Sequence, residues 1–181
     1  LYNTALKLGS EIKNEDVIIR ALNGIANHFE KVSQIDSSLQ YNLQLNKILQ
    51  TKGDYLSLCS NYINIAVCFT QMDSPKKALS FYKKSLSLYD TLELFSPKIL
   101  VFNNIGALYN QLNNADSAIK YLKLSLNLGS YSENINEKTK THLFLSDSYE
   151  MINDYSKALI SYKSYSMLKD SLLSESKIAS I

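Results

Sequence analysis

One pattern returns every 40 residues along this chain and constrains its fold more than any other feature. In each copy, a bulky aliphatic residue is followed by a small residue and, three positions later, by an aromatic residue. The four copies are Ile25-Ala26-Phe29, Ile65-Ala66-Phe69, Ile105-Gly106-Tyr109 and Leu145-Ser146-Tyr149. Nine positions after each aromatic residue comes another small one: Ser38, Ala78, Ala118 and Ala158. A fixed period of this size is typical of a solenoid, in which each unit stacks on its neighbours to bury its apolar face.

Composition favours helices along the whole chain. Only two prolines and five glycines occur among the 181 residues, so few residues would interrupt a helix. Hydrophobic residues make up 45% of the chain and charged residues 20%, which provides enough apolar material for a core and does not suggest disorder. We therefore predict an all-α protein, built as a right-handed α-solenoid of antiparallel helix pairs.

The period also sets the predicted boundaries within a single repeat domain that spans residues 1–181. The domain consists of a partial repeat at 1–13, four repeats at 14–53, 54–93, 94–133 and 134–173, and a C-terminal helical tail at 174–181. The first helix of each repeat is expected at 14–32, 55–72, 97–112 and 134–152. The second helix is expected at 35–50, 75–93, 115–128 and 154–172. Gly9 is expected to end the opening helix 1–9 with a left-handed cap.

The pattern resembles the tetratricopeptide repeat. In the third repeat it is carried by Phe102, Ile105, Gly106, Tyr109, Ala118 and Leu122. The small residue at Gly106 is expected to let the first helix approach the second closely, and the aromatic residue at Tyr109 to fill the gap towards the next repeat. The chain departs from the family in its period, which is 40 rather than about 34 residues, and it lacks the usual proline at the end of each repeat.

Long-period repeats of this type resemble the sensor portions of bacterial two-component and transcriptional regulators. The resemblance implies a protein- or peptide-binding module within a larger signalling protein, in which the array precedes a membrane helix and then a kinase or DNA-binding domain. The sequence begins with Leu1 rather than Met, which suggests a fragment, so contact with a membrane is expected only through segments outside it. The compartment stays open between the periplasm and the cytoplasm.

No residue pattern indicates catalysis, so we predict that the chain is not an enzyme and needs no cofactor or metal. The two histidines, His28 and His142, lie in different repeats, and metal-site spacings and glycine-rich phosphate loops are absent from the sequence. Cys59 and Cys68 lie nine residues apart on one predicted helix, about 13 Å along its axis, which is too far for a disulfide. A net charge of +2 gives no argument for direct binding of nucleic acid.

The resemblance also implies where a partner binds, because the first helices of such repeats line the concave face. The inward positions carry mostly amides, which both donate hydrogen bonds to and accept them from an extended peptide backbone. The predicted groove residues are Asn23, Asn27, Asn64, Asn103, Asn104, Asn110 and Gln111, with Phe144 and Met151 as further candidates. The alternative is that these amides are ordinary surface residues of an asparagine-rich chain.

A second functional class is a structural scaffold or self-association module of a secreted or membrane-anchored protein. Terminal repeats normally present a polar outer face, whereas both ends of this chain carry apolar side chains. These are Tyr2, Ala5 and Leu6 at one end and Leu172, Leu173 and Ile178 at the other. Homodimer contacts are therefore expected at the repeat ends.

Overall fold

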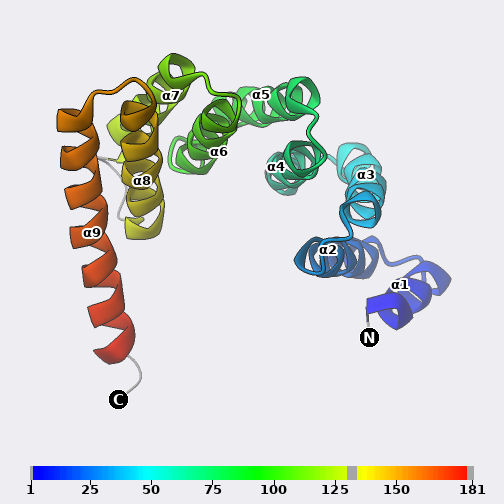
Figure 1. The fold of residues 1–181 in the computed structure, drawn as a ribbon. Helices are drawn as coiled ribbons and strands as arrows, with labels where there is room; N and C mark the ends of the chain where they lie inside the picture. Colours follow the sequence, from blue (N-terminus) through cyan, green and yellow to red (C-terminus); the bar gives the residue numbers. More distant parts are fainter. Residues whose placement is uncertain (1, 130–133, 179–181) are drawn as a thin grey trace. The chain divides into compact units, whose positions relative to one another are not determined.

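The computed structural model describes residues 2–129 and 134–178, with side chains described for 4–129 and 134–174. Over these residues the chain forms helices joined by turns, without a strand, which confirms the predicted all-α fold (Figure 1). The helices are α1 (Tyr2–Glu11), α2 (Glu15–Lys31), α3 (Ile35–Lys52), α4 (Tyr55–Gln71), α5 (Pro75–Thr91), α6 (Lys98–Gln111), α7 (Ala115–Gly129), α8 (Ile135–Met151) and α9 (Tyr155–Ile178).

The chain divides into two compact units, Leu1–Leu88 (unit 1) and Tyr89–Ile181 (unit 2). In unit 1, α2 packs between α1 and α3, and α3 packs on α4. In unit 2, α6 packs on α7 and α8, and α8 packs on α7 and α9. Consecutive helices therefore form the antiparallel pairs that the 40-residue period predicts. The expectation of a single domain over 1–181 stays a prediction.

The turns repeat with the same period as the core. Each described turn contains one residue with a positive φ angle: Lys13, Ser33, Gly53, Asp73, Glu93, Asn113 and Asn153. The next residue donates its backbone N–H to the carbonyl oxygen five residues earlier, as in Gln34 to Phe29 (2.9 Å) and Asn114 to Tyr109 (2.9 Å). This left-handed closure satisfies carbonyl groups at the end of the preceding helix.

Two predicted boundaries are wrong. Gly9 does not cap α1, because the helix continues to Glu11 and Lys13 takes the left-handed conformation. A Cβ atom on Gly9 would lie 2.9 Å from Cγ1 of Val17, so this glycine permits close contact with α2. At the other end, the second helix of the fourth repeat does not stop before the expected tail, because both belong to one continuous helix, α9.

Close packing within the helix pairs follows the predicted small residues. A Cβ atom on Gly106 would lie 2.5 Å from Cγ of Leu122, which confirms that α6 approaches α7 through this glycine. Ala78 and Ala118, the small residues of the second helices, are fully buried. Leu6 of α1, one of the apolar side chains expected to form contacts at the repeat end, packs against the core of unit 1 instead. The side chains of Tyr2 and Ile178 lie outside the described residues.

In three of the four motifs the aromatic residue stacks on the second helix of its own repeat, and Tyr109 also packs against core residues of the next repeat, Leu145 and Tyr149. The stacked pairs, with the distances between ring centroids, are Phe29–Tyr41 (5.5 Å), Phe69–Phe81 (5.6 Å) and Tyr109–Tyr121 (5.7 Å). The physical reason is that the left-handed turn brings the end of the first helix beside the start of the second. The aromatic residues therefore join the two helices of one pair.

Candidate functional site

A groove of about 470 Å³ lies in unit 1 and is the candidate binding site. Side chains from the first helices of two successive repeats, α2 and α4, line it. Its apolar lining comes from Ile19 of α2 and from Leu45 and Leu49 of α3, and both leucines belong to the core of unit 1. The groove therefore combines polar groups on two helices with an apolar base on a third.

Helix α2 contributes Asp16, Arg20 and Asn23, which lie on one face because they are separated by four and three residues. Asn14 begins this helix, and its side chain accepts a hydrogen bond from the backbone N–H of Val17 (3.1 Å). Arg20 is the only arginine in the chain. It supplies the groove with a planar guanidinium group that suits bidentate contact with a carboxylate.

Helix α4 contributes Ser57, Ser60, Asn61 and Asn64 at similar spacing. Asp54 caps this helix by accepting a hydrogen bond from the backbone N–H of Ser57 (3.1 Å), and it also lines the groove. This cap fixes where α4 begins, and therefore which of its side chains face the groove.

Asn61 is the buried polar residue of the groove lining, and it fixes α4 on α3. Its amide nitrogen donates to the backbone oxygen (3.2 Å) and to Oδ1 (3.1 Å) of Asn42, and its Oδ1 accepts from Nδ2 of Asn46 (3.0 Å). Asn42 and Ser38 stand where the other repeats carry a large residue and an alanine, and both are buried. The atypical first repeat thus builds a polar contact beside the groove.

An ion pair between Asp16 and Lys52 stands at the edge of the groove. The hydrogen bond and charge of Lys52, with a smaller contribution from Arg20, hold the pKa of Asp16 below its usual value. The same contact raises the pKa of Lys52. The carboxylate that α2 contributes to the groove, Asp16, is therefore already paired within unit 1.

Of the predicted groove residues, Asn23 and Asn64 line this groove. Asn27 lies one turn beyond Asn23 on α2 and is exposed, but it does not line the groove. The same groove contains Arg20, Ser57 and Ser60, which the sequence analysis did not select. A usable signal was the single arginine in a chain that otherwise carries its positive charge on lysines.

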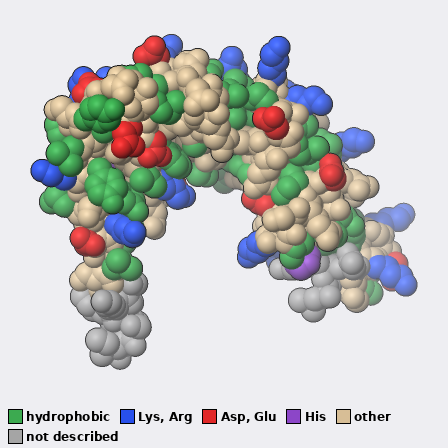
Figure 2. Space-filling view, in the orientation of Figure 1, with side chains coloured by type: hydrophobic (Ala, Val, Ile, Leu, Met, Phe, Trp, Pro, Cys, Tyr) green, Lys and Arg blue, Asp and Glu red, His purple; other side chains and the backbone are tan. Residues whose placement is uncertain are grey.

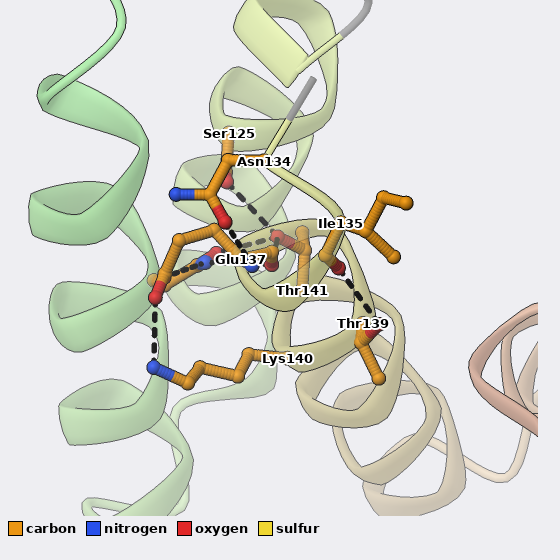
Figure 3. A network of polar contacts seen from close by, with 8 residues as sticks. Ser125, Asn134, Ile135, Glu137, Thr139, Lys140 and Thr141 are labelled. Carbon is orange, nitrogen blue, oxygen red and sulfur yellow. Dashed lines mark hydrogen bonds and ion pairs between the residues drawn. The ribbon is translucent and has the colours of Figure 1, made fainter. Parts of the chain in front are cut away.

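Asn103 was expected in the groove but is fully buried between helices. Its amide nitrogen donates to the backbone oxygen (3.0 Å) and to Oε2 (2.9 Å) of Glu137, and its Oδ1 accepts from Oγ1 of Thr141 (2.7 Å). Figure 3 shows the surrounding network, in which Oγ of Ser125 lies 3.0 Å from Oγ1 of Thr141 and Lys140 pairs with Glu137. The amide of Asn103 is therefore occupied in joining α6 to α8.

Asn110 makes the same kind of contact two helical turns further along α6. Its amide nitrogen donates to the backbone oxygen of Phe144 (2.9 Å), and its Oδ1 accepts from Oγ of Ser148 (2.7 Å). Both asparagines thus reach a carbonyl 34 residues ahead and a hydroxyl 38 residues ahead. The pair forms a polar link between successive first helices, so it fixes how two repeats stack.

The remaining predicted residues lie elsewhere in unit 2. Asn104 is half-exposed on α6, Gln111 is exposed at the end of that helix, and Phe144 packs against the core of unit 2. Met151 lines a separate groove of about 530 Å³, formed by the turns after α6 and α8. Asn64 and Asn104 belong to different units, so a continuous ladder of amides stays a prediction.

The described residues contain no cluster of three or more metal-ligating side chains. Cys59 and Cys68 are both free and buried, which confirms that they form no disulfide with each other, and burial raises the pKa of Cys59 to about 11. His28 is exposed beside Phe29. Within the described part of the chain, no helix is both long and apolar enough to cross a membrane.

Antiparallel helix pairs in a fixed period, with a groove lined by successive first helices, define an α-solenoid repeat protein. Residues 100–128, which contain most of α6 and α7, match the tetratricopeptide repeat family. They lie in the third repeat, where the sequence motif is most complete. The comparison with curated protein sequences found no match.

Solved structures show the same fold over nearly the whole chain. BtubC (BKLC) from P. vanneervenii matches 94% of this chain and 71% of its own, with a TM-score of 0.83 and 18% identity. The apo form of RapI matches 94% of this chain and 47% of its own, with a TM-score of 0.82 and 20% identity. A Rap protein complexed with competence and sporulation factor matches 96% of this chain and 58% of its own, with a TM-score of 0.72 and 12% identity. At these identities the likeness concerns the fold, which is a tetratricopeptide-like α-solenoid.

Proposed function

We propose that this chain is a non-catalytic binding module of the tetratricopeptide repeat type that holds an extended polypeptide in the groove of unit 1. The observation that carries the proposal is the groove itself, in which Asn23 and Asn64 on two first helices flank an apolar base. The Rap protein with a similar fold is complexed with competence and sporulation factor, which supports a binding role for this class of solenoid.

The groove suits a polypeptide because its polar groups both donate and accept hydrogen bonds. The amides of Asn23 and Asn64 match the peptide backbone, and each such contact contributes on the order of 0.5–1.5 kcal/mol net. Arg20 offers a bidentate site for an acidic side chain of the partner. Leu45 and Leu49 supply the apolar contact below the backbone.

Peptide display against the whole chain, followed by affinity measurement on the selected peptides, tests the proposal. The double substitution Asn23→Ala with Asn64→Ala should weaken binding about tenfold or more, as expected for two lost amide contacts. The matched control is Gln40→Ala, which removes an exposed amide from α3 outside the groove. Equal binding by the double variant and the parent protein would place the binding site elsewhere.

We also propose that the module is the sensory or interaction part of a larger bacterial signalling protein. The resemblance of its long-period repeats to such sensors supports this role. The full-length gene provides the test, because the proposal expects a kinase or DNA-binding domain in the same reading frame. A full-length protein that consists of repeats alone contradicts this part of the proposal.

The alternative function, self-association through a repeat end, is favoured by one observation on α9. Leu159, Tyr162 and Leu173 are each more than half exposed, and their spacing places them on one stripe of the helix. Figure 2 shows hydrophobic side chains at the surface over this part of unit 2. Asn42 and Leu122, which are the equivalents of Tyr162 in the first and third repeats, are buried. A second copy of the chain is therefore the proposed partner that covers this stripe. The oligomeric state in solution tests this proposal.

A further inference from the structure

The fourth repeat lacks an aromatic ring that the other three repeats share. Tyr41, Phe81 and Tyr121 occupy equivalent positions on the second helices, 40 residues apart, and the next equivalent residue is Ser161. Ser161 is only 7% exposed, so the position remains an interior one although its side chain is small. A buried serine at this position leaves space that a ring fills elsewhere.

In the second and third repeats this ring lies between two others from the first helix. Phe81 contacts Tyr62 (5.9 Å between centroids) as well as Phe69 (5.6 Å). Tyr121 likewise contacts Phe102 (6.2 Å) and Tyr109 (5.7 Å). In the fourth repeat the flanking positions are occupied by His142 and Tyr149, and the central ring is missing.

A cavity of about 230 Å³ occupies this place in unit 2. His142, Tyr149 and Ser161 all line it, together with Leu126, Lys123 and Lys157. The two outer members of the aromatic stack are therefore present around an open centre. The cavity is smaller than the roughly 300–1,000 Å³ of typical small-molecule sites, so it suits one side chain better than a whole ligand.

We propose that this cavity receives a tyrosine side chain of a polypeptide partner, with an acidic residue beside it. The ring would complete the stack between His142 and Tyr149 that Phe81 and Tyr121 complete in other repeats. The site lies in unit 2 and needs no occupant in the groove of unit 1, so it goes beyond the function proposed above.

The neighbouring repeats and the charge at the cavity favour tyrosine with an acidic neighbour. The ring at the position equivalent to Ser161 is a tyrosine in two of the three other repeats, Tyr41 and Tyr121. Lys123 forms no ion pair with another described residue, whereas Lys157 is paired with Asp154. Lys123 is therefore the cation available to an acidic residue.

The lysine over Tyr149 does not replace the missing ring. Nζ of Lys157 lies 5.6 Å from the centroid of the Tyr149 ring. In the second repeat, Nζ of Lys77 lies 5.3 Å from the centroid of Phe69, which nevertheless stacks on Phe81. The same aromatic position thus accommodates a lysine and a ring together, so Lys157 leaves room for a ring from a partner.

The test uses short capped peptides with the whole protein. N-acetyl-Glu-Tyr-Glu-amide should bind with millimolar affinity and shift the nuclear magnetic resonance signals of His142 and Tyr149. The peptide with leucine in place of tyrosine, and the peptide with lysines in place of both glutamates, should bind at least several-fold more weakly. Equal binding by the leucine peptide, or unchanged signals of both residues with the tyrosine peptide, overturns the proposal.

Ser161→Tyr supplies the missing ring from the chain itself. This variant should melt at a higher temperature and bind the tyrosine peptide about tenfold more weakly or worse. Ser156→Tyr, at an exposed position of α9 outside the cavity, is the matched control and should change neither property. Lys123→Gln should weaken binding by about two- to fivefold. Unchanged peptide binding by a folded Ser161→Tyr variant shows that the cavity is not the site.

Discussion

At the scale of single residues, Gly106 sets the distance between α6 and α7. A side chain at this position would meet Leu122, which is itself fully buried and therefore has no free space to move into. Gly129 offers a contrast within the same helix pair, because a Cβ atom there would lie 3.6 Å from Lys138, an ordinary contact. The two glycines thus differ in what surrounds them.

Substitution of Gly106 should therefore be costly. Gly106→Leu is expected to lower the free energy of unfolding by about 1–3 kcal/mol or more through overpacking, and Gly106→Ala should also be destabilising. Gly129→Ala is the control and should change stability by less than about 1 kcal/mol. Urea denaturation measures all three variants, and an unchanged midpoint for Gly106→Leu would contradict the close approach of the helices.

His142 should make stability depend on pH. Burial lowers the pKa of His142 below the usual value of 6.5, so the unfolded chain binds a proton more readily than the folded chain. The contribution of His142 to stability is complete above about pH 6.5 and declines as the pH falls through that value towards the lower pKa of the folded state. His142→Leu should remove this part of the decline, as measured by melting temperature between about pH 7.5 and 5.5.

The control for this experiment is His28→Leu, which removes the exposed histidine. Its melting temperature should follow the pH dependence of the parent protein. If His142→Leu keeps the same dependence as the parent, the decline belongs to other groups. Asp147 is not one of them, because burial and the nearby charge of Glu150 raise its pKa, and a raised pKa in the folded chain favours folding as the pH falls.

At the scale of helices, asparagines rather than apolar contacts alone hold α6 against α8. Asn103 and Asn110 each satisfy a backbone carbonyl of α8 and a hydroxyl one turn further on. Apolar packing depends little on register, whereas a hydrogen bond requires two particular atoms to meet. The two amides therefore specify the position of α8 along α6.

The loss of one of these links should destabilise unit 2. Asn103→Ala removes the buried hydrogen bonds that Asn103 makes with Glu137 and Thr141, so the free energy of unfolding should fall by about 1–3 kcal/mol. The adjacent Asn104→Ala, at a half-exposed position, should change it by less than about 0.5 kcal/mol. Equal stability of the two variants in chemical denaturation would argue against the structural role of Asn103.

At the scale of the whole molecule, α9 is partly uncovered within the described part of the chain. On α3 and α7, the residues equivalent to Tyr162 and Lys169 are buried, and these helices pack on α4 and α8. On α9, Tyr162 is 52% exposed and Lys169 is also exposed. The stripe mixes apolar and polar residues, so it is neither a fully polar cap nor a complete stacking face.

If this stripe pairs with a second copy, charge placed on it should prevent association. The double substitution Leu159→Lys with Tyr162→Lys is expected to shift the protein to a monomer in sedimentation equilibrium, because two buried charges would face their own copies across the interface. The control is Lys163→Ala with Ser156→Ala, which removes polar groups beside the stripe. A parent protein that stays monomeric at high concentration contradicts the association.

Much of the fold could be predicted from local pattern. The period identified the helix pairs, the buried face of each helix and the packing role of Gly106, because these depend on residues three, four or 40 positions apart that any solenoid of this type must bury. The left-handed turns recur in the same way, although only Gly53 among their positive-φ residues is a glycine, so glycine at position 9 gave a misleading signal.

The candidate site depended on tertiary contacts that the sequence pattern does not reveal. Asn103 and Asn104 are neighbours of the same type in sequence, yet one is fully buried and bonded to Glu137 and the other is half-exposed. Which amide faces a partner depends on where α8 lies against α6, and that position results from the packing of whole helices. For the same reason, the groove around Arg20 and the cavity at Ser161 became visible only when α2 and α4 both packed on α3 and α9 packed on α8. The sequence by itself determined the repeating helices and their apolar faces, and the tertiary structure decided which polar side chains remain available for binding.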